Sequence, residues 1–504
     1  MILSGLLQNI EVLKSHGSLE QAIKGIAYDS REVKEGFLFA ALPGLHTDGH
    51  RYIEEAIARG AVAVLHSQNL SQYRREISYI QVEDSRGSLS PLSAALYNYP
   101  SRELTVVGVT GTDGKSSTVW FIYQLCEALK KSAGFISTVQ FKAQTGAEKN
   151  TLRQSTPEAP EIHKLLRQIK DSGSNIAVVE ATSHGLSSRT SRLADVDFDV
   201  ALLTNVTHEH LEFHGTFEQY RSDKANLFRA LSRSPQKAGI PRFGVVNMDD
   251  PNHEYFRNQS NSPVFSYSLN NHQADLYAAN VAADLCGATF TLHYQGEEQS
   301  AAVNLPGRFN LENIMAAALT LLKLFELPLA AVCAQLTTIK AVKGRMEIVD
   351  LGQPFRVFVD YAHTPGAFMK LLPLVKEHTR GKLTAVFGSA GERDIGKRVK
   401  QGEIAARYCD RIILTDEDPR SEDPMTILRQ IAAAIEPATS GKELFLVADR
   451  KKAIKLALTR ALKQDTVLLL GKGHESSIIY STEAVHWDEH GTARLCLEEL
   501  GYRG

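Results

Sequence analysis

The chain has 504 residues, with 56 lysines and arginines against 58 aspartates and glutamates, and a formal charge of −2. This length exceeds what one hydrophobic core supports and predicts about three domains at roughly 150 residues each. The balanced charge includes no long basic run, so we expect no nucleic-acid partner. No apolar stretch approaches the ~20 residues of a membrane span, no basic leader opens the chain, and five scattered cysteines suit a reducing compartment. We therefore expect a cytoplasmic protein without membrane insertion.

The first hundred residues contain short apolar segments separated by loops. Runs at 36–42 and 61–65 are the clearest, and the stretch ends at the polar residues 98–102. This alternation predicts a small N-terminal α/β domain over residues 1–102.

A glycine-rich loop follows at Gly108–Ser117, between the apolar run 104–109 and a helical pattern over 116–130. A buried strand, a glycine loop and a helix in this order typically hold a phosphate chain, because backbone N–H groups and the helix N-terminus face the anion. Lys115 would reach the terminal phosphates, and Ser116 can ligate Mg²⁺. Val109 stands where a strict Walker A loop has glycine. A chance glycine-rich turn is the alternative, but the register of the three elements favours ATP binding.

Apolar runs continue after this loop. Those at 176–180, 200–204 and 243–247 predict buried parallel strands, with helices at 216–233 and 310–325. Residues 276–305 alternate and contain turn glycines, which predicts a small antiparallel excursion. We assign residues 103–340 to a central P-loop-type parallel-sheet domain.

The last third repeats the pattern of strands and helices. Its predicted strands are 355–360, 383–387, 411–415, 444–447 and 467–470. Helical segments between them predict a second doubly wound sheet, so residues 341–504 form a C-terminal Rossmann-like domain. The fold class is therefore α/β with three domains.

Polar residues follow two neighbouring strands of the central domain. Glu180 and Ser183 follow one, and His208, Glu209 and His210 follow the next. Ligands bind at the carboxyl ends of such strands, so these groups and a nucleotide suit Mg²⁺. Zinc and a solvated polar loop stay as alternatives.

Several motifs in order resemble the Mur ligase family, and within it the MurE-type tripeptide synthetases, over essentially the whole chain. They lie at 29–31, 36–39, 48–50, 108–117, 155–157, 307–313, 344–347 and 360–365. Asp113 stands where the family loop usually has asparagine.

This resemblance implies binding sites for two substrates. The implied ATP-binding residues are Gly111, Thr112, Asp113, Gly114, Lys115, Ser116, Ser117, Asn310, Asn313, Arg345 and Asp360, with the two asparagines at adenine, Arg345 at the phosphates and Asp360 at the ribose. The implied contacts to the UDP-sugar-peptide are Ser30, Ser155, Thr156, Ser183, Arg189 and Arg192. Which of the two arginines faces the substrate stays open, because the local pattern departs from the family.

The implied catalytic residues are Lys115, Lys224 and His210, and the implied Mg²⁺ ligands are Ser116, Glu180, His210 and Lys224. Lys224 resembles the family lysine that CO₂ carbamylates. Carbamylation needs a neutral amine and turns a cation into an anion, which nearby metal charge would favour. Without the family pattern, Lys224 would be an ordinary helix lysine.

The resemblance implies that ATP activates the D-glutamyl carboxylate of UDP-MurNAc-L-Ala-D-Glu as an acyl phosphate, which the amine of a diamino acid then attacks. The third domain would bind that amino acid through Arg393, Asp418, Arg420, Gly471 and Glu475. Arg420 suits the distal carboxylate of meso-diaminopimelate, whereas the extra charge of Asp418 suits the side-chain ammonium of lysine or ornithine. We favour meso-diaminopimelate and expect a monomer.

Two other functions stay as alternatives. One is a different ligase of the same architecture, such as a folylpolyglutamate synthase or another muramoyl-peptide ligase. The other is a non-ligase P-loop switch that hydrolyses nucleotide slowly.

Overall fold

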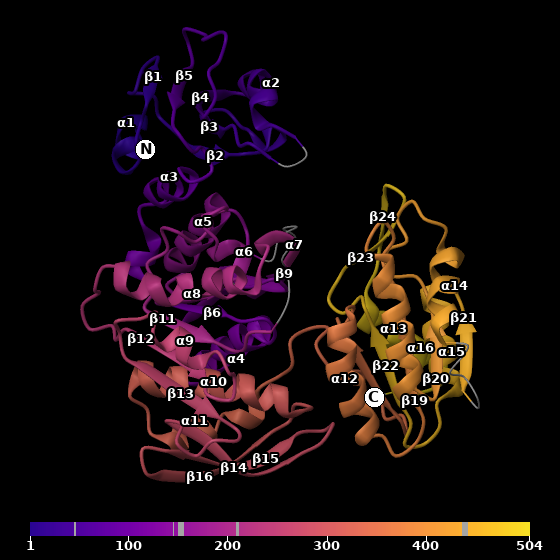
Figure 1. Cartoon of the computed structure of the whole chain (residues 1–504). Coiled ribbons are helices and arrows are strands. Elements are labelled where there is room, and N and C mark those ends of the chain that lie inside the picture. Colours follow the sequence, from indigo (N-terminus) through magenta and orange to yellow (C-terminus); the bar gives the residue numbers. More distant parts are fainter. Residues whose placement is uncertain (45–46, 145, 150–155, 208–210, 436–441, 504) are drawn as a thin grey trace. The chain divides into compact units, whose positions relative to one another are not determined.

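The computed structural model describes residues 1–44, 47–144, 146–149, 156–207, 211–435 and 442–503. The chain divides into two compact units. Unit 1 comprises Met1–Val281, Thr289–Val303 and Phe309–Ile339, and unit 2 comprises Ala282–Ala288, Asn304–Arg308 and Lys340–Gly504. Both are built from helices packed on sheets (Figure 1). Unit 1 includes the predicted N-terminal and central domains together, and the boundaries at residues 102 and 340 stay predictions.

The first sheet of unit 1 has the order β1-β5-β4-β3-β2. Its strands are β1 (Lys14–His16), β2 (Gly25–Ala27), β3 (Phe37–Ala40), β4 (Ala61–His66) and β5 (Ser78–Gln81). All neighbours pair in parallel except β1, which runs antiparallel to β5. The helices of this region are α1 (Leu3–Leu6), α2 (Ile53–Ala58) and α3 (Leu89–Leu96).

The second sheet of unit 1 has the order β16-β15-β14-β13-β12-β11-β6-β10-β7-β8-β9. Its strands from β6 to β13 are β6 (Thr105–Thr110), β7 (Ala133–Ile136), β8 (Gln140–Gln144), β9 (Gly146–Lys149), β10 (Ile176–Glu180), β11 (Val200–Leu203), β12 (Phe243–Asn247) and β13 (Val264–Ser268). Strands β7, β10, β6, β11, β12 and β13 pair in parallel. Every residue of β10, β11 and β12 is buried, as expected for parallel strands covered on both faces.

The alternating segment 276–305 extends this same sheet. It forms β14 (Leu276–Ala283), β15 (Ala288–Tyr294) and β16 (Glu297–Val303). Gln295 and Gly296 join the last two strands with φ angles of +50° and +84°, the pattern of a tight hairpin turn. However, β14 pairs in parallel with β13, so the predicted excursion is continuous with the second sheet of unit 1.

Helices cover the second sheet. They are α4 (Lys115–Ala128), α5 (Ala159–Asp171), α6 (Ser183–Leu186), α7 (Leu211–His214), α8 (Phe217–Arg233), α9 (His253–Arg257), α10 (Arg308–Phe325) and α11 (Leu329–Cys333). One hydrophobic cluster joins α5 and α8 to alternate residues of the strands, including Val106, Val179 and Leu203. The apolar residues of these strands and helices therefore form the hydrophobic core next to the glycine-rich loop at Gly108–Ser117, called the phosphate loop below.

Unit 2 contains a sheet of order β17-β18-β22-β19-β20-β21, parallel except for β17. Its strands are β17 (Glu347–Ile348), β18 (Arg356–Asp360), β19 (Leu383–Phe387), β20 (Arg411–Leu414), β21 (Glu443–Leu446) and β22 (Thr466–Leu470), and a separate hairpin is formed by β23 (Ser477–Tyr480) and β24 (Glu483–His486).

The two faces of this sheet are covered by different helices. They are α12 (Pro365–Glu377), α13 (Ile395–Tyr408) and α14 (Pro424–Ile435) on one face, and α15 (Arg450–Arg460) and α16 (Glu489–Glu499) on the other. Phe358 packs in the hydrophobic cluster with α12, α13 and α14, whereas its neighbours Val357 and Val359 pack in the cluster with α15 and α16. The predicted doubly wound sheet is confirmed.

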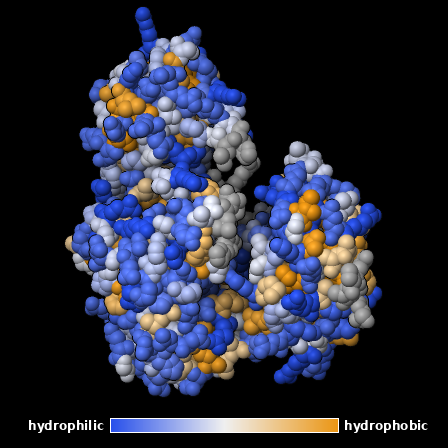
Figure 2. Space-filling model, viewed as in Figure 1, coloured by the Kyte–Doolittle hydropathy of each residue, from blue (hydrophilic) through white to orange (hydrophobic). Residues whose placement is uncertain are grey.

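The surface is largely polar. Figure 2 shows mostly hydrophilic side chains on the face in view, with apolar residues in small groups. Among the described helices, none is both long and apolar enough to cross a membrane. All five cysteines are free thiols, and only Cys286 is exposed.

One buried histidine predicts a pH-dependent stability. His163 on α5 is fully buried, neither ring nitrogen has a hydrogen-bond partner among the described residues, and burial lowers its pKa to about 3. In the unfolded chain the histidine pKa is near 6.5, so His163 is protonated at pH values where it stays neutral in the folded chain. The free energy of unfolding therefore decreases as pH falls from about 6.5 towards 3. At pH 5 the loss is about 2 kcal/mol.

We expect His163→Phe to lose less stability than the native chain between pH 7.5 and pH 5, as measured by urea unfolding. The exposed His486, changed to Gln, is the control and keeps the native pH dependence. An unchanged pH dependence in His163→Phe would contradict the assignment.

Candidate functional site

The loop between β6 and α4 depends on two glycines. Gly111 has φ +151° and Gly114 has φ +80°. A Cβ atom on Gly111 would lie 1.8 Å from Thr204 Oγ1, and one on Gly114 would lie 2.2 Å from Asn313 Oδ1. Neither position tolerates a side chain, because neighbouring groups already occupy the space. The two glycines therefore let the loop approach Thr204 and Asn313 closely at the N-terminus of α4.

The loop backbone between these glycines is held by the end of β11. Thr204 Oγ1 donates to the carbonyl of Asp113 at 2.6 Å, and the N–H of Asp113 donates to Asn205 Oδ1 at 3.0 Å. The Asp113 residue itself is exposed. Since the contacts to Thr204 and Asn205 use backbone atoms, the unusual aspartate fits the loop without changing how it is held.

The start of α4 brings a lysine, a serine and a carboxylate together. Lys115 Nζ donates to the carbonyls of Gly111 and Thr112 at 3.0 and 2.7 Å. Ser116 Oγ donates to Glu180 Oε2 at 2.8 Å. Thr138 was not predicted from the sequence; its N–H and Oγ1 donate to the two oxygens of Glu180, each at 2.9 Å. Thr138 follows β7 at the carboxyl end of the parallel strands. Because ligands bind at this edge of such sheets, its position after β7 could have identified Thr138 as a site residue.

Lys224 is buried on α8 beneath the loop. Its side chain is 1% exposed, and Nζ donates to the carbonyl of Gly111 at 2.5 Å and lies 4.5 Å from the centre of the Tyr220 ring. Sequence spacing alone favoured a solvated helix lysine, and the structure contradicts that interpretation. Lys224 therefore joins Lys115 at the same carbonyl of the phosphate loop.

The residue before Lys224 anchors a serine. Asp223 Oδ2 lies 2.7 Å from His214 Nδ1, and His214 Nε2 lies 3.0 Å from Ser183 Oγ. All three side chains are buried. This chain of contacts fixes Ser183 relative to the helix that holds Lys224.

The two candidate arginines lie in different surroundings. Arg192 Nη1 donates to the carbonyl of Thr156 at 2.9 Å, and its Nη2 lies 2.9 Å from Glu158 Oε1. Arg189 is exposed and donates to the carbonyl of Phe213 at 2.6 Å. Arg192 is therefore the arginine beside Thr156.

The remaining predicted residues of unit 1 are placed as follows. Asn313 lies against Gly114 and accepts a hydrogen bond from Thr118 Oγ1 at 3.3 Å. Asn310 is also buried on α10, Ser117 is half-buried in the first turn of α4, and Ser30 is buried after Asp29, whose carboxylate caps a short helical turn. Ser155 and His210 lie outside the described residues.

In unit 2, Asp360 closes β18 and is fixed by backbone donors. Its Oδ2 accepts the N–H of Met346 at 2.8 Å, and its Oδ1 accepts the N–H of Ala362 at 2.7 Å. Burial raises the pKa of this carboxyl group, and Arg345 opposes the shift. The Arg345 guanidinium lies 4.7 Å from the centre of the Tyr361 ring.

Asp418 and Glu475 both contact one lysine. Lys472 Nζ lies 2.9 Å from Asp418 Oδ1 and 2.5 Å from Glu475 Oε2. The extra charge of Asp418 is therefore offset by a fully buried ammonium that the sequence analysis did not single out. Its only sequence signal was its place after Leu470, at the end of the buried run that forms β22.

The loop after β20 holds Arg420 in a left-handed conformation with φ +55°. Its N–H donates to the carbonyl of Ile479 at 2.9 Å, and its Nε is buried without a hydrogen-bond partner among the described residues. Arg393 is exposed. Gly471 has φ +100°, and a Cβ there would lie 3.1 Å from Glu417 Oε2. Burial raises the pKa of Glu417 to about 7.

Oxygen atoms dominate the group beneath the phosphate loop. Ser116, Thr138 and the carboxylate of Glu180 provide the hard oxygen donors that suit Mg²⁺. Within the described ranges, no three His, Cys, Asp or Glu side chains gather into a metal site. The zinc alternative concerned residues 208–210 in particular, which lie outside those ranges.

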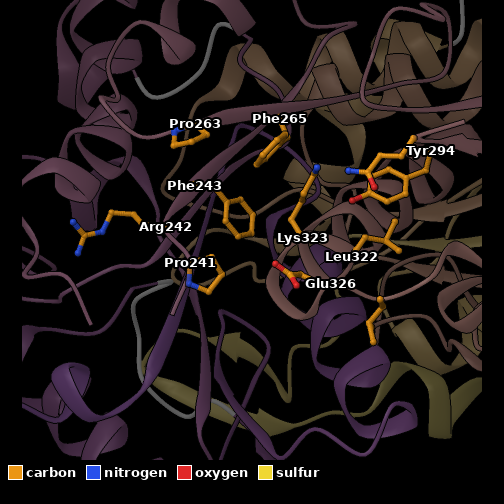
Figure 3. Close-up of a pocket in the computed structure, with 11 residues that line it drawn as sticks. Pro241, Arg242, Phe243, Pro263, Phe265, Tyr294, Leu322, Lys323 and Glu326 are labelled. Atoms are coloured by element: carbon orange, nitrogen blue, oxygen red, sulfur yellow. The ribbon is translucent and has the colours of Figure 1, made fainter. Parts of the chain in front are cut away.

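A cavity of about 460 Å³ lies elsewhere in unit 1 (Figure 3). Phe243, Phe265, Tyr294 and Lys323 line it, and the Lys323 ammonium lies 3.9 Å from the centre of the Phe265 ring. Phe243 begins β12 and Phe265 is near the start of β13, whereas the phosphate loop follows the end of β6. Since these strands are parallel, the cavity belongs to the opposite edge of the sheet.

The glycine loop makes one direct prediction. We expect Gly114→Ala to weaken ADP binding by at least tenfold in calorimetry, because the new methyl group displaces Asn313 and the loop. Gly173→Ala is a matched control, since Gly173 has φ +86° and nothing within 4 Å of its Cβ position. It should lose about 1 kcal/mol of stability from backbone strain and bind ADP normally. Normal ADP affinity in Gly114→Ala would contradict the prediction.

Comparisons with known proteins cover all three predicted regions. Residues 22–93 match the Mur ligase family catalytic domain, residues 109–321 the Mur ligase middle domain, and residues 344–473 the Mur ligase glutamate ligase domain. The chain is 45% identical to a protein of Treponema denticola named UDP-N-acetylmuramyl-tripeptide synthetase, over 97% of each chain.

Two further relatives carry a more specific name. The chain is 35% identical to UDP-N-acetylmuramoyl-L-alanyl-D-glutamate–2,6-diaminopimelate ligase of Geobacillus kaustophilus, over 99% of this chain and all of the other. A solved structure of a ligase with that name matches with a TM-score of 0.68 at 28% identity, over 99% of each chain.

These matches span nearly the whole chain and confirm the α/β architecture. The chain belongs to the Mur ligase family of ATP-dependent amide ligases.

Proposed function

We propose that this enzyme adds a diamino acid to UDP-N-acetylmuramoyl-L-alanyl-D-glutamate and consumes ATP, in the synthesis of peptidoglycan precursors. The observation that supports it most is the Ser116–Glu180 contact beside Lys115 and Lys224, in a chain similar over its length to tripeptide synthetases. The UDP-linked substrate and ATP both belong to the cytoplasm, which supports a cytoplasmic enzyme. That it acts as a monomer stays a prediction.

The phosphate loop would bind the triphosphate of ATP. Backbone N–H groups at the start of α4 face the phosphates, and the Lys115 ammonium turns from the loop carbonyls to the terminal phosphate. Ser116 and Glu180 would hold Mg²⁺, with His210 and carbamylated Lys224 as further ligands. When bound, Mg²⁺ supplies positive charge against the phosphate oxygens. Thr138 keeps the Glu180 carboxylate in one orientation.

The acceptor would lie beside α6. Ser183, held by His214, and Thr156 would contact the peptide, and Arg192 would reach the same segment. The 2.9 Å contact from Arg192 to the Thr156 carbonyl supports this arginine over Arg189. Ser155 would extend the contact, and Ser30 would bind the uridine nucleotide.

Within unit 1, Asn310 and Asn313 would contact the adenine of ATP. Within unit 2, Asp360 would contact a ribose and Arg345 the phosphates. Each oxygen of Asp360 accepts one backbone N–H and keeps a lone pair for a ribose hydroxyl. Since Asn313 touches Gly114, it would also maintain the phosphate loop.

The reaction itself consists of two transfers. The γ-phosphate passes to the D-glutamyl carboxylate and ADP leaves. The neutral amine of the diamino acid then attacks the acyl phosphate, loses a proton as the amide forms, and expels phosphate. The protein contributes positioning and fixed positive charge, which are the main sources of acceleration for such transfers.

The incoming amino acid would be meso-2,6-diaminopimelate, bound by Arg393, Asp418, Arg420, Gly471 and Glu475. The distal carboxylate would meet the Arg420 guanidinium, whose planar fork fits a carboxylate. The Lys472 ammonium offsets Asp418, which weakens the case for a bare side-chain ammonium at this position. The relatives named as diaminopimelate ligases support the same choice.

Steady-state turnover tests both parts of this proposal. We expect phosphate release from ATP only with the UDP-linked dipeptide and a diamino acid together, and a kcat/KM at least tenfold higher for meso-diaminopimelate than for L-lysine or L-ornithine. Turnover without the dipeptide would overturn the ligase function. A preference for lysine or ornithine would overturn the choice of amino acid alone.

Substitution of Lys224 tests whether this lysine is carbamylated and needed for catalysis. We expect Lys224→Ala to lose at least a hundredfold in kcat, without recovery in bicarbonate, because no amine remains to react with CO₂. Native enzyme equilibrated with ¹³C-bicarbonate should show a carbamate carbon signal that is absent in Lys224→Ala. A fully active Lys224→Ala enzyme, or a signal unchanged by the substitution, would rule out this role.

A further inference from the structure

Lys472 is the most deeply buried ammonium in the loops that end the strands of unit 2. Its side chain has no exposed surface, yet Nζ lies 2.9 Å from Asp418 Oδ1 and 2.5 Å from Glu475 Oε2. A buried cation is stable only when it is paired, and here one cation serves two carboxylates. Lys472 therefore fixes two residues of the proposed amino-acid site through one atom.

Both carboxylates have a second anchor. Asp418 Oδ1 also accepts the N–H of Ile479 at 3.0 Å, and Glu475 Oε1 accepts the hydroxyl of Tyr361 at 3.2 Å. The side chains of Asp418 and Glu475 are 14% and 34% exposed, so they reach solvent where Lys472 does not. The buried lysine contacts both carboxylates, and the exposed parts of Asp418 and Glu475 stay accessible to a ligand.

We propose that Lys472 is a positioning residue that sets the charge of the amino-acid site and thereby selects among diamino acids. This inference rests on the proposed ligase function. With Lys472 present, Asp418 and Glu475 together leave one surplus negative charge, and without it they would leave two. Loss of Lys472 would therefore make this part of the site more negative and favour a ligand with more positive charge.

The diamino acids differ in this respect. Diaminopimelate has two ammonium groups and two carboxylates at neutral pH, so its net charge is zero. Lysine and ornithine have two ammonium groups and one carboxylate, so their net charge is +1. In a partly buried site with an effective dielectric constant of about 20, one unmatched charge changes relative affinity by an order of magnitude or more. The two contacts of Lys472 therefore affect the relative affinity of the site for diaminopimelate, lysine and ornithine.

Two substitutions should move the preference in opposite directions. Lys472→Met removes one positive charge and should raise the lysine-to-diaminopimelate ratio of kcat/KM at least tenfold. Asp418→Asn removes one negative charge and should lower the same ratio at least fivefold. Both variants and the native enzyme are assayed at the same pH, so that their ratios can be compared directly.

A matched control separates selectivity from folding. Lys237 is another buried lysine, 2.5 Å from the buried Asp199, and it belongs to unit 1. Lys237→Met should lower the urea midpoint and leave the ratio for the three amino acids unchanged. Lys472→Arg keeps the charge and should keep the native ratio even where kcat falls.

The inference is tested by the lysine-to-diaminopimelate ratio of kcat/KM and not by kcat alone. Equal losses for all three amino acids in Lys472→Met and Asp418→Asn would overturn the inference, as would shifts of the same sign. Where Lys472→Met does not fold, Asp418→Asn decides alone. Failure of the proposed function would be seen separately, as native enzyme that shows no turnover dependent on the UDP-linked dipeptide.

Discussion

The close approach of the phosphate loop to its neighbours is the constraint on which the candidate phosphate site depends. Gly111 lies against Thr204 at the end of β11, and Gly114 lies against Asn313 on α10, with no room for a Cβ atom at either glycine. Because these neighbours belong to different elements, the loop keeps its shape only when strand and helix are both in place. Lys115 and Ser116 begin α4 directly after Gly114, so their directions are set by the same contacts.

Both units contain buried charged side chains that are held in ion pairs. Lys237 pairs with Asp199, Arg450 with Glu489, and Lys472 with two carboxylates. Such pairs are weak sources of stability, since desolvation offsets most of the attraction, but breaking one leaves an unpaired buried charge. Their main effect is geometric. A side chain in such a pair has one orientation, which suits groups that must meet a ligand without rearrangement.

The strands and the loop were predictable from sequence because their signals are local. Strands β10 and β12 match the apolar runs residue for residue, and the loop at Gly111–Ser116 has its glycines at fixed spacing. Thr138 was not found, because its partner Glu180 is 42 residues away. Lys472 was not found, because its contact with Asp418 spans 54 residues, although its second partner Glu475 is only three residues away. The parallel pairing of β14 was missed for the same reason, since alternation predicts a strand but not its neighbour.

The charge of a single residue is an unsafe guide to ligand choice when its partner is distant in sequence. Read alone, Asp418 adds a negative charge and favours a ligand with a free ammonium. In the fold its Oδ1 already accepts from Lys472 and from the backbone of Ile479, so the group that a ligand meets is an ion pair. Arg420 has only its backbone tied to β23, by the contact to Ile479, and the buried Nε of its guanidinium has no hydrogen-bond partner in the described ranges. Among the residues that the structure describes, no carboxylate forms an ion pair with this guanidinium, so it can meet a carboxylate of the ligand. This supports the proposed ligand with a distal carboxylate over one with a bare amine.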